Sequence, residues 1–258
     1  MSAILHRRTF IRLAAGITVG TFIRPTPLHA VETRGEVRAV AFDAFPIFDP
    51  RPIFELADEL FPGKGAELGK AWRTQQFEYT WLRTAANQYA NFWQVTGDAL
   101  NFAARSLKLD LATEKRERLM NAYLKLKPWP DVPDAMRKLK ASGLRLALLS
   151  NFTRGMLDAG LKNSGVADAF EYILSTDQVK QFKPAASAYQ MAVNAFGRPK
   201  EQIVFAAFAG WDASGAKWFG FPTVWVNRSN APFEELAAAP DAVCPNMMGL
   251  LEFVNARR

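Results

Sequence analysis

The amino-acid sequence predicts an α/β fold, in which helices cover both faces of a parallel sheet and further helices are inserted after its first strand. Beyond residue 128, short apolar runs alternate with amphipathic segments, as expected for strands joined by helical crossovers. Between residues 50 and 127, helical periodicity dominates and no strand pattern is evident. One apolar strand precedes this block, so the block is predicted to interrupt the sheet.

The composition is that of an ordinary globular protein. Of the 258 residues, 49% are hydrophobic and 22% are charged, so a sizeable core must form and a disordered chain is excluded. The length allows one large domain, or one domain that carries an insertion. Cys244 is the only cysteine, so an internal disulfide is excluded.

The first 30 residues have the pattern of a signal peptide. A basic start with Arg7 and Arg8 leads into an apolar stretch and then into small residues that end at Ala30. The adjacent arginines, with Phe10 two residues on, resemble a twin-arginine signal, which predicts export to the periplasm. The alternative is an amphipathic N-terminal helix of the folded domain. The apolar stretch is too short to span a membrane stably, so no lasting membrane insertion is expected.

Removal of residues 1–30 would limit the chemistry that is possible. Four of the 32 basic residues and none of the 25 acidic ones lie there, so the formal net charge would fall from +7 to +3. No basic run would remain, so nucleic acid is not an expected partner. Both histidines, His6 and His29, would also be lost. This excludes a Ser-His-Asp or Cys-His nucleophile and a histidine-ligated metal site.

The predicted elements divide the chain into a core and a cap. A strand at residues 37–42 ends at Asp43, and residues 31–49 are assigned to the core. Residues 50–127 are assigned to a helical cap over the sheet. Its predicted helices span residues 53–61, 66–87, 88–107 and 113–126, with breaks at 62–63 and 107–112.

Residues 128–258 are predicted to complete the core. The predicted strands span residues 144–149, 172–175, 203–207 and 223–227. The predicted helices span residues 134–142, 156–164, 185–196 and 213–219. Gly143 and Gly197 end two of these helices, as glycine commonly does.

Polar side chains follow the predicted strands and are expected to meet at one edge of the sheet. In open parallel sheets, ligands bind outside the carboxyl ends of the strands. The side chains that follow strands here are Asp43, Ser150, Asn151, Lys183 and Asp212. The sequence therefore predicts a binding or catalytic site built from these groups.

Four ordered motifs carry a family resemblance. They are Phe42-Asp43-Ala44-Phe45, Leu148-Leu149-Ser150-Asn151, Phe182-Lys183-Pro184 with Tyr189, and Trp211-Asp212-Ala213-Ser214-Gly215-Ala216. Together with residues 72–83 and 219–228, they resemble the haloacid dehalogenase superfamily, and specifically its L-2-haloacid dehalogenases. The resemblance covers nearly the whole mature chain. It implies a Rossmann-like core with an inserted helical cap.

The resemblance implies a covalent mechanism without a cofactor. Asp43 would attack C2 of a short-chain (S)-2-haloacid, displace halide and form an aspartyl ester, which water would cleave to a 2-hydroxy acid. Lys183 would keep Asp43 ionised, and Asp212 would orient Lys183 or assist the water. The alternative for Lys183 and Asp212 is a structural ion pair, and for Asp43 a turn cap at the strand end.

The resemblance also implies residues that bind the substrate. Arg73 would contact the departing halide, with Asn151 and Phe92 completing that cradle. Ser150 would hold the substrate carboxylate. Tyr189 and Trp211 are assigned to the same group of binding residues. As alternatives, Arg73 fits a solvated helix cation, and Phe92 and Trp211 fit plain core aromatics.

A phosphatase is the less favoured member of the same superfamily. Those enzymes carry a second aspartate two residues after the nucleophile, where this chain has Phe45. They also carry a further acid where Ala216 stands. Both differences argue against phosphoryl transfer and against a bound metal, so no metal site is predicted.

Three departures from the family pattern favour an alternative function. The first motif lacks the family's Gly-Thr pair and is one residue shorter. Residues 207–210 read Ala-Phe-Ala-Gly, without the usual serine and asparagine, and Phe152 replaces a glycine. An apolar pocket can favour attack on a carbon–halogen bond by desolvating Asp43. Lost hydrogen bonds could instead leave a diverged, weakly active or non-catalytic protein that binds small carboxylates. A homodimer is also possible, as in family relatives.

Overall fold

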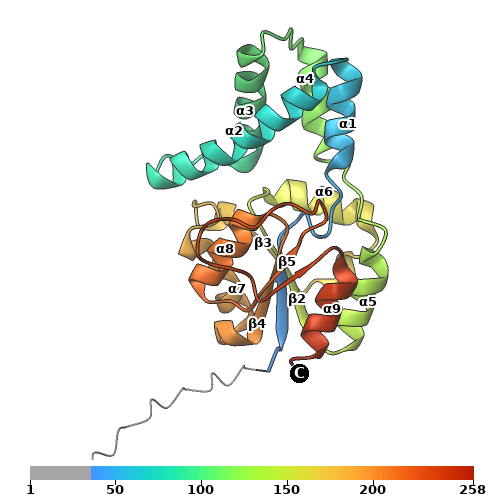
Figure 1. Cartoon of the computed structure of the whole chain (residues 1–258), viewed down its shortest axis with the longest axis vertical. Coiled ribbons are helices and arrows are strands. Elements are labelled where there is room, and N and C mark those ends of the chain that lie inside the picture. Colours follow the sequence, from blue (N-terminus) through green and yellow to red (C-terminus); the bar gives the residue numbers. More distant parts are fainter. Residues whose placement is uncertain (1–35) are drawn as a thin grey trace, which may run out of the picture. The chain divides into compact units, whose positions relative to one another are not determined.

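The structure, a computed structural model, describes residues 36–258 and consists there of a parallel α/β sheet with inserted helices (Figure 1). The predicted signal peptide lies outside the described residues. The sheet has six parallel strands in the order β3-β2-β1-β4-β5-β6. They are β1 (Ala39–Phe42), β2 (Arg145–Ser150), β3 (Tyr172–Ser175), β4 (Ile203–Ala207), β5 (Thr223–Val226) and β6 (Ala242–Cys244). The predicted fold class is confirmed.

The first strand lies at the centre of the sheet because it is apolar throughout. All four residues of β1 are buried, as expected for a strand covered on both faces. Phe42 pairs with Leu148 of β2 on one side and with Ala206 of β4 on the other. The residue that follows Phe42 therefore emerges at the middle of the carboxyl edge.

Helices cover both faces of the sheet and bury a hydrophobic layer on each. One face packs against α5 (Val132–Ala141), α6 (Arg154–Ser164) and α9 (Met247–Asn255), and the other against α7 (Ala186–Phe196) and α8 (Gly210–Phe219). Figure 1 shows α7 and α8 on one side of the strands and α5 and α9 on the other. These helices cover the faces of the sheet, so its carboxyl edge stays available for a functional site.

Four helices are inserted between β1 and α5. They are α1 (Arg51–Leu60), α2 (Gly65–Ala85), α3 (Phe92–Ser106) and α4 (Thr113–Ala122). The long helix α2 packs against both α1 and α3. Asn91 caps α3 by accepting a hydrogen bond from the Gln94 backbone N–H. The chain enters and leaves this block through two adjacent segments, which pair through Phe48 and Pro128.

The structure adds two elements to the prediction and shifts several boundaries. Strand β6 and helix α9 were not predicted, because the segment before them reads as loop and β6 has only three residues. Helix α2 ends at Ala85 and α3 begins at Phe92, so a six-residue connection separates them where the prediction placed adjoining helices. Helix α8 begins at Gly210, three residues before the predicted start at residue 213, so Asp212 lies in its first turn.

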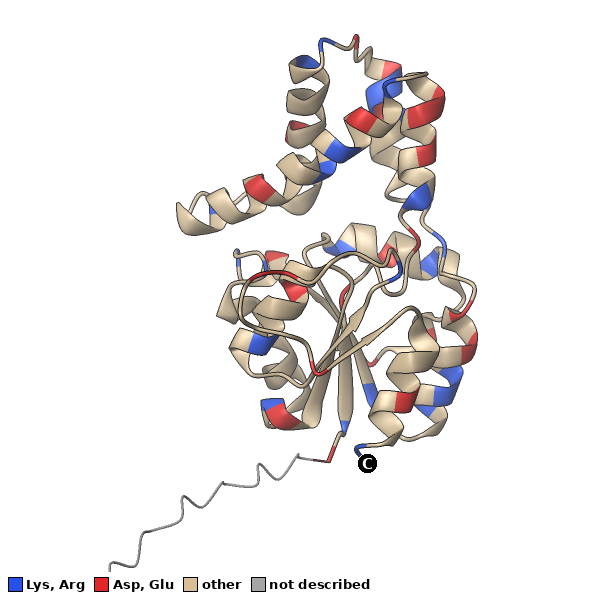
Figure 2. Cartoon of the chain, in the orientation of Figure 1, with Lys and Arg blue, Asp and Glu red and all other residues tan. Residues whose placement is uncertain are grey.

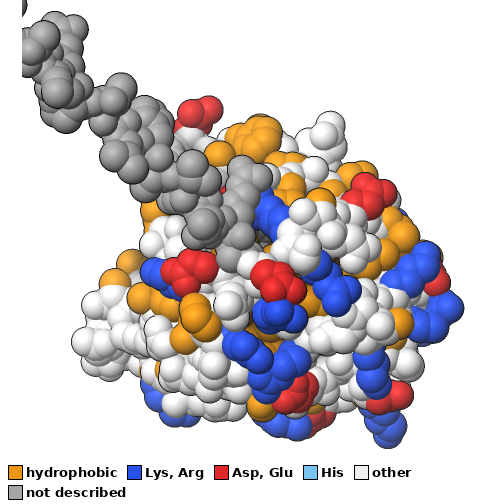
Figure 3. Space-filling model, turned by 90° about the horizontal axis from the view of Figure 1, so that it is seen from below, with side chains coloured by type: hydrophobic (Ala, Val, Ile, Leu, Met, Phe, Trp, Pro, Cys, Tyr) orange, Lys and Arg blue, Asp and Glu red, His pale blue; other side chains and the backbone are white. Residues whose placement is uncertain are grey.

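Charged side chains are spread over the core and the inserted helices (Figure 2). Figure 3, a view from below, shows basic and acidic side chains interspersed with small apolar areas. Several form exposed ion pairs, such as Asp134 with Arg137 and Lys138, which contribute little stability each. In the part of the chain that the structure describes, every helix is too short or too polar to cross a membrane.

Candidate active site

Asp43 stands at the centre of the carboxyl edge, directly after β1. Its backbone N–H donates to the Ala206 carbonyl at 3.0 Å, which extends the sheet pairing by one residue. Its carboxylate is held on both oxygens. Oδ1 accepts a 2.8 Å hydrogen bond from Lys183 Nζ, and Oδ2 accepts a longer one, 3.3 Å, from the Phe45 backbone N–H. Oδ2 is therefore the oxygen that is held by the weaker hydrogen bond and that is not paired with the Lys183 cation.

Lys183 joins Asp43 to a second buried carboxylate. Its Nζ lies 2.6 Å from Asp212 Oδ2, and the Tyr189 hydroxyl donates to Asp212 Oδ1 at 2.7 Å. Lys183 and Asp212 are each 1% exposed, so water does not screen the pair. A Cβ on Gly215 would lie 2.6 Å from the Tyr189 hydroxyl oxygen, which explains the glycine at this point of α8.

The charges of this cluster follow from burial and from mutual attraction. Burial alone would lower the pKa of Lys183, but the adjacent carboxylates of Asp212 and Asp43 outweigh it and raise that pKa. Burial raises the pKa of Asp212 to about 6, against the opposing effect of Lys183. Burial and the Asp212 charge raise the pKa of Tyr189 well above its usual value. At neutral pH, Lys183 is therefore a cation and Tyr189 a hydrogen-bond donor.

The end of β2 supplies Ser150 and Asn151. Asn151 Oδ1 accepts hydrogen bonds from the Lys183 backbone N–H at 3.0 Å and from Thr176 Oγ1 at 3.4 Å, which fixes the orientation of its amide. Within the described residues, its Nδ2 makes no hydrogen bond. Ser150 Oγ accepts a hydrogen bond from the Phe152 backbone N–H at 3.2 Å, so its hydroxyl proton stays available. Both side chains line the cavity beside Asp43.

A small, mostly aromatic cavity adjoins these polar groups. Its volume is about 20 Å³, room for about one water molecule. Phe152 packs edge-on against Phe45 at 5.2 Å between ring centroids and lies 5.5 Å from Phe92. Phe45 also contacts the ring of Phe208 at 5.6 Å. The cavity is lined by Asp43, Phe45, Arg73, Phe77, Phe92, Ser150, Asn151, Phe152, Lys183, Phe208, Ala209, Trp211 and Asp212.

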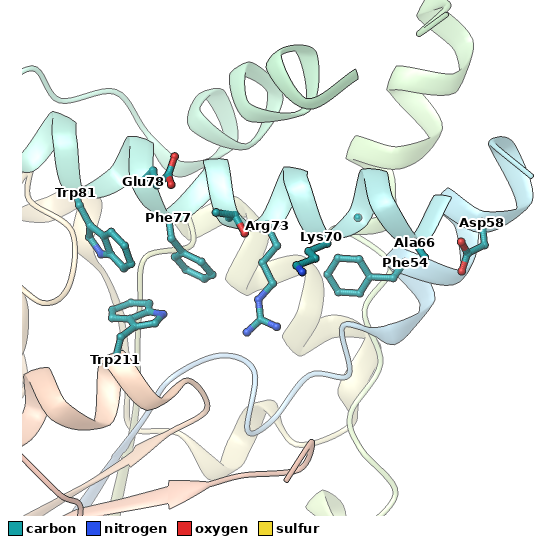
Figure 4. A pocket seen from close by; sticks show the side chains of 11 residues that line it. Phe54, Asp58, Ala66, Lys70, Arg73, Phe77, Glu78, Trp81 and Trp211 are labelled. Atoms are coloured by element: carbon teal, nitrogen blue, oxygen red, sulfur yellow. The ribbon is translucent and has the colours of Figure 1, made fainter. Parts of the chain in front are cut away.

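Arg73 reaches the cavity from α2. It points away from the helix axis between Phe77 and Lys70 (Figure 4), and its guanidinium lies 5.9 Å from the ring centroids of Phe77 and Phe208. Among the described residues it has no hydrogen-bond or ion-pair partner. Solvent reaches the side chain, yet the surrounding protein lowers the pKa of Arg73 by desolvation. It is a cation available to an anion.

A wider groove lies on the other side of Arg73. Its volume is about 650 Å³, and it shares Arg73, Phe77 and Trp211 with the small cavity. Trp211 packs edge-on against Phe77 at 5.1 Å and Trp81 at 5.5 Å (Figure 4). The groove therefore leads to the small cavity past these aromatic rings.

The structure brings together all but one of the residues predicted for the site. Tyr189 is the exception, because it lies fully buried behind Asp212 and does not line the cavity. Sequence reasoning missed Phe77, which lines the cavity. Its position four residues after Arg73 places both on one helix face, so the helical spacing could have identified it. Among residues 36–258, no group of three or more His, Cys, Asp or Glu side chains is arranged to hold a metal ion.

The architecture and the paired Asp43 and Lys183 at the sheet edge are those of haloacid dehalogenase-like hydrolases. Residues 20–220 match the model of that family, described as haloacid dehalogenase-like hydrolase, and the chain belongs to it.

Several known proteins are similar over most of the chain. The (S)-2-haloacid dehalogenase of Pseudomonas sp. strain YL is 42% identical, over 84% of this chain and 94% of the relative. The haloacetate dehalogenase H-2 of Moraxella sp. strain B is 37% identical, over 85% and 98% respectively. The structure of L-2-haloacid dehalogenase from Xanthobacter autotrophicus superposes with a TM-score of 0.79 at 30% identity, over 86% of this chain and all of that one.

Proposed function

We propose that this chain is a hydrolytic dehalogenase that converts short-chain (S)-2-haloacids to 2-hydroxy acids. Its relative from Pseudomonas is named as an (S)-2-haloacid dehalogenase, and the one from Moraxella as a haloacetate dehalogenase. One observation carries the proposal: the Asp43 carboxylate lies 2.8 Å from Lys183 Nζ at the wall of an aromatic cavity that the unpaired cation Arg73 also lines. A carboxylate nucleophile, its counter-ion and a site for a leaving anion are thus in one place.

In the first step, Asp43 Oδ2 attacks C2 of the haloacid opposite the halogen. The new C–O bond forms as the carbon–halogen bond breaks, and halide leaves. Arg73 and Asn151 Nδ2 stabilise the negative charge that develops on the halogen, while Ser150 holds the substrate carboxylate. A similar Xanthobacter structure, at 30% identity, contains covalently bound chloropropionic acid, which supports an ester intermediate.

In the second step, water attacks Cγ of the Asp43 ester. Asp212 accepts a proton from this water, because a carboxylate with a pKa of about 6 is an effective base at neutral pH. The tetrahedral intermediate then expels the product oxygen, which takes that proton from Asp212, and the second proton of the water is released to solvent so that Asp43 is again a carboxylate. Asp43 keeps the oxygen of the water, and its former Oδ2 leaves in the 2-hydroxy acid. Only the first step touches C2, so the configuration inverts.

We also propose that the reaction needs neither a metal nor another cofactor. Phe45 and Ala216 stand where metal-dependent members of the superfamily carry acids, and neither side chain can bind a cation.

We further propose that the protein is exported to the periplasm and that it assembles as a homodimer. The first 30 residues would act as a twin-arginine signal, so cell fractionation should find the processed protein in the periplasm. The exposed apolar side chains Leu82 on α2 and Phe102 on α3 would permit a homodimer, which light scattering would detect.

Halide release from (S)-2-chloropropionate and chloroacetate, with a chelator present, tests the proposal. We expect release by the wild-type protein and none by Asp43→Asn, which keeps the size of the side chain but not its nucleophilicity. A single turnover with excess enzyme in oxygen-18 water should label a peptide that contains Asp43. Binding of the acids without halide release would instead favour a non-catalytic binder of small carboxylates.

A further inference from the structure

The loop that carries Asp43 contains no side chain that can hold it in place. Between Asp43 and Asp49 the residues are Ala, Phe, Pro, Ile and Phe, and none of these side chains forms hydrogen bonds. Backbone turns to Ala44 give the loop local shape, with Ile47 N–H and Phe48 N–H donating to its carbonyl at 3.1 and 2.8 Å. Any further restraint must come from other segments.

Trp129 supplies such a restraint from the segment that leaves the inserted helices. Its indole N–H donates to the Phe45 carbonyl at 2.9 Å, and its backbone N–H donates to the Ile47 carbonyl at 3.1 Å. Two residues further along the loop, the Asp49 N–H donates to the Lys127 carbonyl at 2.8 Å. The loop is therefore joined along its length to residues 127–129.

Arg228 restrains the next carbonyl of the loop from the end of β5. Its guanidinium donates to the Pro46 carbonyl at 3.1 Å and to both oxygens of Asp131, at 2.9 and 3.0 Å. Asp131 in turn accepts from the Met247 N–H at 2.7 Å. The guanidinium also lies 4.5 Å from the ring centroid of Trp129. Its side chain is 8% exposed, so these hydrogen bonds are largely shielded from water.

We propose that Trp129 and Arg228 are positioning residues that orient the nucleophilic carboxylate of Asp43 through the backbone of Phe45. We call these two residues and Asp131 the loop brace. The brace fixes two successive carbonyls, those of Phe45 and Pro46. The N–H of Phe45, at the start of the same stretch, is the group that donates to Asp43 Oδ2. This N–H shares its peptide group with the Ala44 carbonyl, which the Ile47 and Phe48 N–H groups hold, and the brace fixes the two peptide groups that follow, so rotation of the N–H away from the carboxylate is opposed from both sides.

The loop brace affects the rate of displacement by Asp43 more than the affinity of the site for the substrate. In-line displacement requires a near-attack geometry, and small displacements of the attacking oxygen cost large factors in rate. The brace residues do not line the cavity beside Asp43, so they do not contact the substrate. This inference rests on the proposed function, because it assigns to the brace the orientation of the attacking oxygen.

The test uses Trp129→Phe in the full chain, which removes the indole N–H but keeps an aromatic ring. We expect the rate of the first-turnover burst of halide from (S)-2-chloropropionate to fall about tenfold, while the substrate concentration that half-saturates this burst rate stays within about twofold. Hydrogen–deuterium exchange of residues 43–49 should become faster. Arg228→Lys should act in the same direction, because an ammonium cannot donate to Asp131 in a bidentate manner and also reach Pro46.

Trp72→Phe is the matched control. It removes a comparable bond, from the indole N–H to the Thr96 carbonyl at 2.8 Å, within the inserted helices. It should leave exchange in residues 43–49 unchanged. Unchanged exchange there in Trp129→Phe would overturn the brace, and faster exchange with an unchanged rate of the halide burst would overturn its role in positioning. If the wild-type protein released no halide, the proposed function would fail, and exchange alone would decide whether the brace exists.

Discussion

Replacing Tyr189 by phenylalanine tests the assignment of Asp212 as the base. The substitution removes the 2.7 Å hydrogen bond from the hydroxyl to Asp212 Oδ1 and a longer one, 3.2 Å, to the Asp212 backbone carbonyl, and it keeps the ring against Phe205 and Phe219. The bond to Oδ1 stabilises the ionised carboxylate and so lowers the pKa of Asp212. Its loss should raise the pKa from its present value of about 6.

The size of the shift follows from the burial of both groups. A hydrogen bond to a charged group contributes about 1.5–3 kcal/mol, and each pKa unit corresponds to about 1.4 kcal/mol. The pKa of Asp212 should therefore rise by about one to two units. Below that pKa the carboxyl is protonated and cannot accept a proton from water. The rate of ester hydrolysis should then fall on the acid side at about pH 7–8, whereas in the wild type it falls near pH 6.

The assay follows decay of the aspartyl ester by mass spectrometry after rapid mixing, over a range of pH. Tyr172→Phe is the control, because it also removes a hydrogen bond between a tyrosine and a charged partner, here from Arg145 at 2.8 Å. Tyr172 begins β3, at the edge of the sheet away from Asp43, so its removal should not move the profile. An acid limb that stays near pH 6 in Tyr189→Phe would refute Asp212 as the base.

Three further substitutions separate the roles in the site. Arg73→Ala should lower the rate of the first-turnover halide burst about 100-fold with a smaller change in the substrate concentration that half-saturates it, and rapid-mixing kinetics with a change confined to that concentration would argue against a halide cradle. Asp212→Asn should let the ester persist, which intact-protein mass spectrometry would show as an added mass; a variant without the adduct that still turns over would contradict this. Phe152→Ala should lower the free energy of unfolding by about 3–5 kcal/mol. Its ring is 2% exposed and packs on Phe45 and Phe92; denaturant unfolding would measure the change.

The location of the polar site could be predicted because it follows from one rule of parallel sheets. Each strand carries its next residue to the same edge, so Asp43 and Ser150 must approach each other wherever the loops run. Lys183 was harder, since it follows β3 by a 3₁₀ turn and a loop rather than directly. The pattern of strands and the family motif together brought it into the prediction.

The parts that escaped prediction depend on side chains that meet across long sequence separations. Nothing in the residues around Trp129 indicates that its indole would reach the Phe45 carbonyl, 84 positions earlier. Tyr189 was expected to bind substrate, yet α7 and α8 pack so that its hydroxyl faces the far side of Asp212. These contacts depend on how helices and loops pack against one another, and the residues around each position do not indicate that packing.

The site is better equipped for the first chemical step, attack on C2, than for the second, hydrolysis of the aspartyl ester. Attack on C2 requires Asp43, Lys183 and an anion site, and all of these are in place. Hydrolysis requires a water held against Cγ of Asp43. Both oxygens of Asp212 are already engaged, one by Lys183 and one by Tyr189, and the segment 207–209 beside the cavity offers no side-chain hydrogen bond. Each missing oriented donor costs about 2.7–4 kcal/mol of transition-state stabilisation. Ester hydrolysis should therefore limit turnover, and the first turnover should release halide in a burst equal to the concentration of enzyme.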